Sequence, residues 1–365
     1  VEGVRRRWTT GANSEKLTLV VSFAGHEIDA FEQFWANDTP LTLDGNGWVQ
    51  TAPYLKSITV TQELSGTLDG TGGASVTLPS APIGAVVAFN VLGSGETYGE
   101  TALAVSGSGT SYTLSGGVAA TAYKLTYQTT AGQSLMRIRP WLGTAAQNVG
   151  ATLAAEYPGQ ITIADKFAGI ALAVVDLTYD PDAFPQGIPN ITAVMRGAKC
   201  LDPRTGLTAW TQNPALHAYH YARHTHGWAV PAAEINTTDV ITAANFCDIS
   251  TTFTLGVDDV TLPRYRCGLV AATDADPREV MADIMETMAG RWGWAGGTLR
   301  MRCGRMATSV WALDESWVAQ RVADNGMLEQ APVVRITNGV PRDQRLNRVV
   351  GKCIDPDQRY QLLPY

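Results

Sequence analysis

The chain has 365 residues, of which 45% are hydrophobic and 17% are charged, and 36 of them are glycines. This composition argues against a disordered chain and is typical of a turn-rich protein built from β-strands, with or without helices. The net charge of −7 argues against a nucleic-acid-binding surface, and no apolar run approaches the ~18 residues that a membrane-spanning helix needs.

Both ends of the sequence give expectations about the whole protein. Residues 1–7 are basic, but no apolar stretch with a cleavage site follows them, so we predict no signal peptide. Val1 is not an initiator methionine, and Tyr365 falls within a pattern of strands and loops. We therefore expect this chain to be an ordered piece of a longer polypeptide. Its own 365 residues are long enough for roughly two to four compact modules.

Alternating apolar residues predict two strands near the start of the chain. The first covers residues 17–23 and ends at a turn that begins with Gly25. The second covers residues 30–36, and Asn37 and Asp38 form the turn after it.

The composition changes at Lys56. Residues 56–134 are rich in Gly, Ser, Thr and Ala and nearly free of charge. They contain short β-type runs, such as A-V-V-A-F-N-V-L and A-Y-K-L-T-Y, separated by turn residues at the spacing of a small β-sandwich. We predict an inserted β-sandwich-like domain at residues 56–135. The alternative is a low-complexity linker, which is less consistent with the repeated alternation of Val, Tyr and Leu.

Strand patterns resume after the insert. Residues 136–138 continue a strand, and residues 170–179 are typical of a long buried one. Gly187 and Pro189 then end one segment and start an extended one at residues 191–195, whose apolar residues alternate.

Turn and helix signals follow closely. The pentapeptide D-P-R-T-G at residues 202–206 predicts a tight turn, in which proline presets φ and glycine is free to take a positive φ. Asn213 and Pro214 predict a helix start, because asparagine caps free N–H groups and proline lacks an N–H where none is needed. We expect Trp210 to be buried, and strand, turn, tryptophan and capped helix together indicate a scaffold without an exposed nucleophile.

Two more helices are predicted in the second half. A short one covers residues 243–247, and the clearest one covers residues 277–289. Asp276 is the cap of the latter, Glu279 completes a capping box and Gly290 ends the helix. Strand patterns return beyond residue 300, so β elements lie on both sides of an α+β region.

Four of the five histidines lie within ten positions, at His217, His220, His224 and His226. On a helix from Pro214 the first three share a face, and His220 and His224 have the i, i+4 spacing of metal-binding helices. No Glu lies among them, as a metalloprotease would require. We interpret the face as a solvent or interface edge and predict no metal site, with His217, His220 and His224 as the candidate ligands if a metal is bound.

No other pattern predicts a catalytic or cofactor-binding residue. Asp180, Asp182, Asp202 and Asp248 stand beside turns, and turn formation accounts for them without a glycosidase pair of carboxylates. Glycine-rich nucleotide motifs and a G-x-S-x-G elbow are absent. The five cysteines include no C-x-x-C pair, so we expect reduced core residues and neither zinc nor thioredoxin-like chemistry.

Five segments of the chain resemble segments of a known protein family, and they occur in the same order as in that family. They read G-A-N-S-E-K-L-T-L-V-V-S-F-A-G-H-E-I-D-A near the start, R-P-W-L-G-T-A-A-Q-N after the insert, Q-G-I-P-N-I-T-A-V-M-R-G-A-K-C-L-D-P-R-T-G with A-W-T-Q-N-P-A-L in the centre, then A-A-N-F-C-D, and finally R-L-N-R-V-V-G-K-C-I-D-P-D-Q-R-Y-Q. In this order they resemble the central tail hub proteins of long-tailed bacteriophages, the lambda-like tail tip attachment protein J family. The resemblance covers most of the chain apart from residues 56–134. Thr211 departs from it, since Ser is usual there, and so does the histidine cluster.

The resemblance implies an α+β, mostly β fold in which tube-like β-barrels flank an α+β module. The expected domains are residues 1–55 (first half of a β-barrel module), 56–135 (the inserted domain), 136–185 (the continuation of the first module), 186–306 (the α+β hub module) and 307–365 (the truncated start of a second β-barrel). It also implies a homotrimer, because a hub closes around a tube and a closed ring needs one repeated heterologous interface.

The implied function is that of a structural virion protein. A central tail hub connects the tail tube to the host-contacting tip and forms part of the channel for DNA, which it meets only in transit. The expected partners are distal tail and tail tube proteins, the tape measure protein, other tip proteins and, through regions absent here, a host receptor. The protein would be made in the bacterial cytoplasm and reside at the tail tip of the virion, with no enzymatic activity and no cofactor. The alternative is a tail-associated peptidoglycan hydrolase, for which the sequence offers no catalytic dyad, zinc triad or lysozyme-like carboxylate pair.

Overall fold

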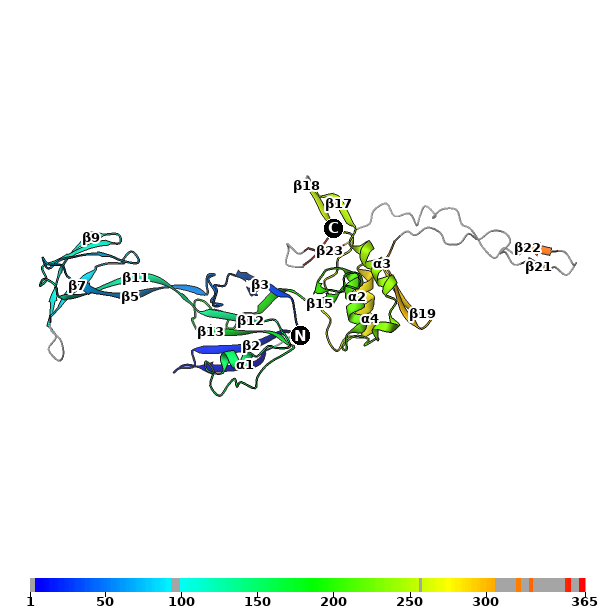
Figure 1. Ribbon diagram of the computed structural model, residues 1–365, viewed down its shortest axis with the longest axis horizontal. Coiled ribbons are helices and arrows are strands. Elements are labelled where there is room, and N and C mark those ends of the chain that lie inside the picture. The colour runs from blue at the N-terminus through cyan, green and yellow to red at the C-terminus, as the bar shows by residue number, and fades with distance from the viewer. Residues whose placement is uncertain are drawn as a thin grey trace. The chain divides into compact units, whose positions relative to one another are not determined.

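The structure is a computed structural model that describes residues 4–92, 99–255, 258–305, 320–322, 328–330, 352–355 and 361–364. The chain divides into two compact units, Val1–Gly304 and Arg305–Tyr365, which are described separately. Strands outweigh helices in the described residues, so the prediction of a mostly β fold is confirmed (Figure 1). No helix among the described residues is both long enough and apolar enough to cross a membrane.

The first unit begins with a four-stranded antiparallel sheet of order β1-β2-β13-β12. Its strands are β1 (Val4–Thr10), β2 (Lys16–Ala24), β12 (Met136–Trp141) and β13 (Ala171–Thr178). β13 is buried along most of its length, because both faces of the sheet are covered. Ala173 and Val175 pack into one apolar cluster, whereas Leu172 and Val174 pack into another on the opposite face. The strands predicted at the positions of β2 and β13 are confirmed.

A short helix, α1 (Val149–Leu153), lies over one of these faces. Leu153 and Ile161 pack there against Trp8 of β1. The sequence did not predict α1, because a helix of five residues is too short to show a clear period.

A three-stranded sheet of order β14-β3-β4 packs on the other face. Its strands are β3 (Ala30–Ala36), β4 (Thr39–Leu41) and β14 (Ile191–Arg196). Phe34 and Leu41 join the cluster that contains Val175. The expected α+β module begins at residue 186, but β14 pairs with β3 and so belongs with the N-terminal strands. Pairing between such distant segments leaves no local signal in the sequence.

The insert consists of two sheets around a core of its own. One sheet contains β5 (Leu55–Thr67), β11 (Ala122–Ser134), β7 (Val87–Leu92) and β8 (Gly99–Ala102), and the other contains β6 (Ala74–Thr77), β10 (Ser111–Ser115) and β9 (Ala104–Ser108). Leu68, Leu114, Leu125 and Tyr127 are buried between them. β5 and β11 extend past the sheet as a two-stranded ribbon that leads to β12 (Figure 1). A packed core of this kind distinguishes the insert from a flexible linker.

Replacing residues 56–133 by the dipeptide Asn-Gly should leave the rest of the first unit folded. Leu55 and Ser134 face each other at the base of the ribbon, and Asn-Gly is the two-residue turn that best joins paired strands. The N–H of Leu135 donates to the carbonyl of Tyr54 (2.8 Å), which keeps the joined ends in register. Hydrogen exchange in β13 should therefore be as slow in the shortened chain as in the full one.

The complementary piece, residues 55–134, is the matched control for this deletion. It should fold by itself, because its apolar cluster contains only insert residues. The deletion also removes the ion pair between Lys56 and Asp180, which is half-exposed at the lysine and of small energetic weight. Insoluble protein or fast exchange in β13 after the deletion would show that the insert is part of the N-terminal core.

Helices and β-hairpins alternate in the described part of residues 199–305. The elements are β15 (Lys199–Leu201), β16 (Thr208–Trp210), α2 (Pro214–Arg223), the 3-10 turn η1 (Ala232–Glu234), α3 (Thr237–Cys247), β17 (Ser250–Leu255), β18 (Asp258–Pro263), α4 (Pro277–Glu286), β19 (Arg291–Ala295) and β20 (Thr298–Arg302). α2 packs against both α3 and α4. The buried faces form one cluster, the helical core, in which Ala218, Ala244, Met281 and Leu299 are almost fully buried.

Two of the three predicted helix starts agree with the structure. α2 and α4 begin at the predicted prolines, and Asn213 and Asp276 are their caps. α3 begins at Thr237, capped by Asn236, and is longer than the predicted helix at residues 243–247. β-branched residues at its start favour strands, and the cap together with burial of Val240 overrides that preference.

α4 ends at Glu286, earlier than the predicted residue 289. The left-handed residue after it is Ala289 (φ +47°), not Gly290. Gly290 is required for space instead, because a Cβ there would lie 2.7 Å from the carbonyl oxygen of Arg302.

The second unit is described only in part. β21 (Gln320–Val322) pairs with β22 (Leu328–Gln330), and β23 (Lys352–Asp355) pairs with β24 (Gln361–Pro364). Most of the second barrel module expected at residues 307–365 lies outside the described residues, as does most of the resembling segment near the C-terminal end.

Candidate functional site

The D-P-R-T-G pentapeptide forms the loop between β15 and β16. The N–H of Gly206 donates to the carbonyl of Asp202 (2.8 Å), and Gly206 has the positive φ (+74°) that the sequence predicts. The side-chain carboxylate of Asp202 accepts the N–H of Arg204 (2.9 Å). The loop is thus closed by its own residues.

Asn213 connects this region to two helices. Its side chain is almost completely buried, with 3% of the residue exposed. The side-chain oxygen accepts the N–H groups of Ala215 (3.0 Å) and Leu216 at the start of α2. The side-chain amide donates to the carbonyl of Ala244 (2.9 Å) and to the carboxylate of Asp248 (2.8 Å). One side chain therefore caps α2 and fastens it to the end of α3.

Arg204 connects the β15–β16 loop to the C-terminal end of α3. Its guanidinium lies 2.7 Å from one oxygen of Asp202 and 2.7 Å from one oxygen of Asp248, and it also donates to the side-chain oxygen of Asn245 (3.2 Å). The hydrogen bonds from Arg204 lower the pKa of Asp202, and those to Asp202 raise the pKa of Arg204. We call this group the three-segment junction; its residues are Asp202, Arg204, Asn213, Asn245 and Asp248.

Sequence reasoning assigned these residues to separate local tasks. Asp202 was a turn residue and Asn213 a helix cap, and the structure confirms both roles. The sequence did not predict that these residues belong to one hydrogen-bonded network, which depends on the ion pair between Arg204 and Asp248. Trp210, expected to be buried, is half-exposed and lies under the guanidinium of Arg196, 5.0 Å from its ring centroid.

A second junction lies in the segment R-P-W-L-G-T-A-A-Q-N. Gln147 is 7% exposed. Its side-chain oxygen accepts the N–H of Gly143 (2.8 Å), and its amide donates to the carbonyls of Phe167 (2.8 Å) and Ile170 (3.1 Å). A Cβ at Gly143 would lie 2.7 Å from the backbone nitrogen of Ala171, so glycine is required there. The sequence marks Gln147 only through the resembling segment, because its partners are backbone groups of another loop.

The structure places two of the three candidate metal ligands side by side. α2 ends at Arg223, and His224 is its cap residue, whose N–H donates to the carbonyl of His220 (3.0 Å). His217 uses its Nε2–H to bond the carbonyl of Thr211 (2.8 Å). His220 and His224 have ring centroids 5.4 Å apart. Within the described residues no three His, Cys, Asp or Glu side chains are arranged to hold a metal ion.

The turn role expected for Asp180 is confirmed. Its carboxylate accepts the N–H groups of Asp182 (3.0 Å) and Ala183 (3.2 Å). It also accepts a hydrogen bond from Lys56, which is the main cause of its lowered pKa. The carboxylate is therefore ionised and engaged with its own turn.

The four cysteines with described side chains are buried, as predicted, and form no disulfide bonds: Cys200, Cys247, Cys267 and Cys303. Burial raises the pKa of Cys200 and of Cys247 to about 12. Their thiols stay protonated near neutral pH and are poor nucleophiles. The side chain of Cys353 lies outside the described residues.

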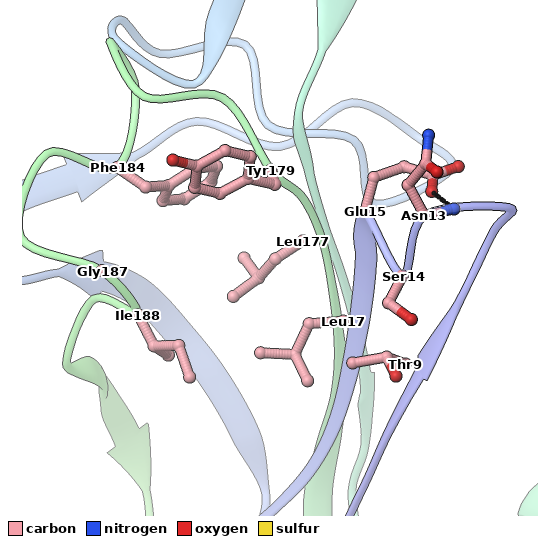
Figure 2. A pocket seen from close by; sticks show the side chains of 10 residues that line it. All are labelled: Thr9, Asn13, Ser14, Glu15, Leu17, Leu177, Tyr179, Phe184, Gly187 and Ile188. Atoms are coloured by element: carbon pink, nitrogen blue, oxygen red, sulfur yellow. Dashed lines mark hydrogen bonds between the residues drawn. The ribbon is translucent and has the colours of Figure 1, made fainter.

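A groove of about 440 Å³ opens beside the β1–β2 turn (Figure 2). Apolar side chains dominate its lining, including Leu177, Phe184 and Ile188. Its single carboxylate, Glu15, accepts the N–H of Asn13 (3.0 Å), and backbone hydrogen bonds lower its pKa. The ten lining residues include no His, Cys or Lys, and Glu15 and Tyr179 are the titratable side chains among them.

Both junctions hold separate segments of backbone together through buried side-chain amides and charge-assisted bonds. Such networks give rigidity and a unique arrangement of segments when all their members are satisfied. A comparison of the sequence with models of known protein families and with curated proteins finds no match.

Proposed function

We propose that the chain forms the central tail hub of a long-tailed bacteriophage, or the portion of it that these residues comprise. It acts as a non-enzymatic virion protein at the tail tip, where it joins the tail tube to the parts that contact the host and encloses part of the path for DNA.

The observation that carries this proposal is the three-segment junction. Asp202 and Arg204, Asn213, and Asp248 come from three segments that resemble the tail hub family, and they meet through direct hydrogen bonds. Their polar groups bind one another and the helix ends. This arrangement suits a rigid scaffold better than a site that must bind and release a substrate.

The finer architecture follows from the same proposal. The N-terminal sheets form the first tube-like barrel module, the helical core is the α+β hub module, and the second unit begins another barrel module. Three copies close into a ring through one repeated heterologous interface, and the ring contacts the tail tube, distal tail, tape measure and other tip proteins.

Mass measurement and localisation test this proposal together. Mass photometry of the purified chain should give a species of three times 39.0 kDa, and gold-labelled antibodies should bind the tail end of intact particles in electron micrographs. A chain that is absent from particles, or a tail map with a copy number other than three, would contradict the proposal.

A peptidoglycan assay separates the hub from a tail-associated hydrolase. Incubation of the purified chain with peptidoglycan should release no muropeptides above the level of a heat-denatured sample. Release that scales with protein concentration would favour the enzyme.

A further inference from the structure

The two N-terminal sheets are joined along one side. Leu43, just after β4, pairs with Val49, and Trp48 pairs with Arg137 of β12. The N–H of Val49 also donates to the carbonyl of Met136 in β12 (3.0 Å). Strand pairing thus links β14, β3, β4, β12, β13, β2 and β1 in one series, as in a barrel that is not yet closed.

The two ends of this series are free edges. In the described part of the chain, β1 pairs with β2 alone and β14 pairs with β3 alone. A free edge presents a row of unpaired N–H and C=O groups, on which a strand from another chain can add. We call these two edges, together with the groove of Figure 2, the open seam.

The groove gives the open seam an apolar floor. Thr9 of β1 and Leu17 of β2 lie on one side of it, and Ile188, which precedes β14, lies on the other (Figure 2). Tyr179 and Ile188 are 68% and 54% exposed, which is unusual for side chains of this size. An extended segment with apolar side chains at alternate positions would cover them.

Positive charge stands beside the groove on β1. Arg7 is exposed and, two positions before Thr9, lies on the groove side of the strand. Arg6 lies on the opposite side and pairs there with Asp165 (2.7 Å). Glu15, the carboxylate of the groove, is bound by a backbone N–H of its own turn. A strand that combines apolar residues with an acidic one therefore fits the open seam.

The β17–β18 hairpin has the complementary properties. It forms a two-stranded sheet of its own, and a hairpin that packs on nothing is only marginally stable in water. Its described side chains lie outside the buried apolar clusters, and Thr251, Thr252 and Asp259 are exposed. The hairpin, which we call the arm, therefore gains stability from a further surface.

The register of the arm places its apolar residues at matching positions. Phe253 stands opposite Val260, and Leu255 stands opposite Asp258. Alternate positions of both strands thus carry apolar residues, with one carboxylate among them. Each strand of the arm has six residues, which matches the six of β14 and the seven of β1.

We propose that the arm of one copy of this chain docks in the open seam of a neighbouring copy. One strand of the arm pairs with the free edge of β1, its apolar positions cover the groove, and Asp258 comes beside Arg7. This docking rests on the tail hub function proposed above, because a ring of copies supplies the neighbouring arm. The arm and the open seam are different surfaces, so their contact is heterologous and can repeat around a closed ring.

Cross-linking from the groove tests which segment occupies it. Tyr179 is replaced by the photoreactive p-benzoylphenylalanine in the full chain, and unlabelled and 15N-labelled chains are mixed before irradiation. Mass spectrometry should find residue 179 of one isotope joined to β17 or β18 of the other. The same photoreactive residue at Val118, which is 51% exposed on the insert, is the control and should give no such product.

A charge exchange tests the pairing of Arg7 with Asp258. Arg7→Glu and Asp258→Arg should each raise the concentration at which half of the trimer dissociates, by at least about tenfold, because each places like charges together. The double variant should restore most of this loss. Lys124→Glu makes the same change of charge on the insert, where Lys124 pairs with Glu63, and should leave the trimer as in the parent. Dilution followed by mass photometry measures all four variants.

The outcomes separate this docking from the tail hub function. A trimer that withstands both single substitutions, cross-links to the arm of the same chain only, or cross-links to other segments would overturn the docking and leave the hub proposal standing. Loss of the trimer in each single variant without recovery in the double variant would also overturn it. Mixed-isotope cross-links to the arm in a chain that is absent from phage particles would support the docking and contradict the hub.

Discussion

Replacing Asn213 by Ala should lower the free energy of opening of α2 by about 3 kcal/mol. The helix cap alone accounts for about 1 kcal/mol of this. The remainder comes from the lost bonds to the Ala244 carbonyl and the Asp248 carboxylate, one of which is left buried without its donor. Hydrogen exchange of the α2 amides under native conditions measures this free energy directly.

Asn236→Ala is the matched control. Asn236 caps α3 through the N–H of Asp239 (3.0 Å), but the residue is only half-buried and stands outside the three-segment junction. Its loss should therefore cost about 1 kcal/mol, the ordinary value of a cap. Equal effects of the two substitutions would show that Asn213 is a simple cap and that the three-segment junction adds nothing to the stability of α2. In particles, Asn213→Ala should reduce tail assembly without a separate loss of activity in particles that do assemble.

Replacing Arg204 by Met should cost about 2 kcal/mol. The substitution keeps much of the side-chain volume but leaves Asp202 and Asp248 without their shared cation. Asp248 is the C-terminal cap residue of α3, where the helix dipole disfavours a negative charge. Hydrogen exchange of α3 amides in the parent and the variant measures the loss.

Arg300→Met is the control for this change. Arg300 pairs with Asp239 through two hydrogen bonds, but its side chain is 39% exposed and Asp239 lies in the first turn of α3, where the dipole favours its charge. The expected loss is below about 1 kcal/mol. Equal losses for the two arginines would contradict the role assigned to the junction.

The pH dependence gives the Arg204 prediction a second readout. The pKa of Asp202 is lowered in the fold, so its stabilising effect is complete above the unfolded pKa of about 3.9 and is lost as the pH falls through the lower folded value. Arg204→Met should remove this loss of stability at low pH, because the side chain that lowers the pKa of Asp202 is absent. A parent and a variant with the same acid dependence would show that Arg204 does not hold the Asp202 charge.

Local signals in the sequence were sufficient to predict the features that depend only on neighbouring residues. Asn213 and Asp276 cap the helices that begin after them, and Gly206 takes the positive φ of its turn. Each of these features depends on residues within a few positions, and the same side chain makes the same bond in any fold. Asn236 carries the same cap signal, with an acidic residue three positions later, and would have placed the start of α3 correctly.

Two helix ends differ from the prediction, because tertiary packing decides where these helices stop. α4 stops before Gly290, because Ala289 adopts the left-handed conformation and Gly290 is needed where the chain passes the Arg302 carbonyl. α2 ends one residue before His224, although the ring of His224 still lies beside that of His220. Neither the crowding around Gly290 nor the end of a helix is visible in residue periodicity.

The sequence by itself determined several strands and turns, the starts of α2 and α4 and the mostly β character of this protein, because these depend on periodicity, capping and turn geometry over short stretches. Only the tertiary structure decided that β14 pairs with β3 and that Arg204 reaches Asp248. These contacts join residues that share no local pattern. They form because the apolar faces of the sheets and helices must be buried together, and that burial brings the polar groups at their ends within hydrogen-bonding distance.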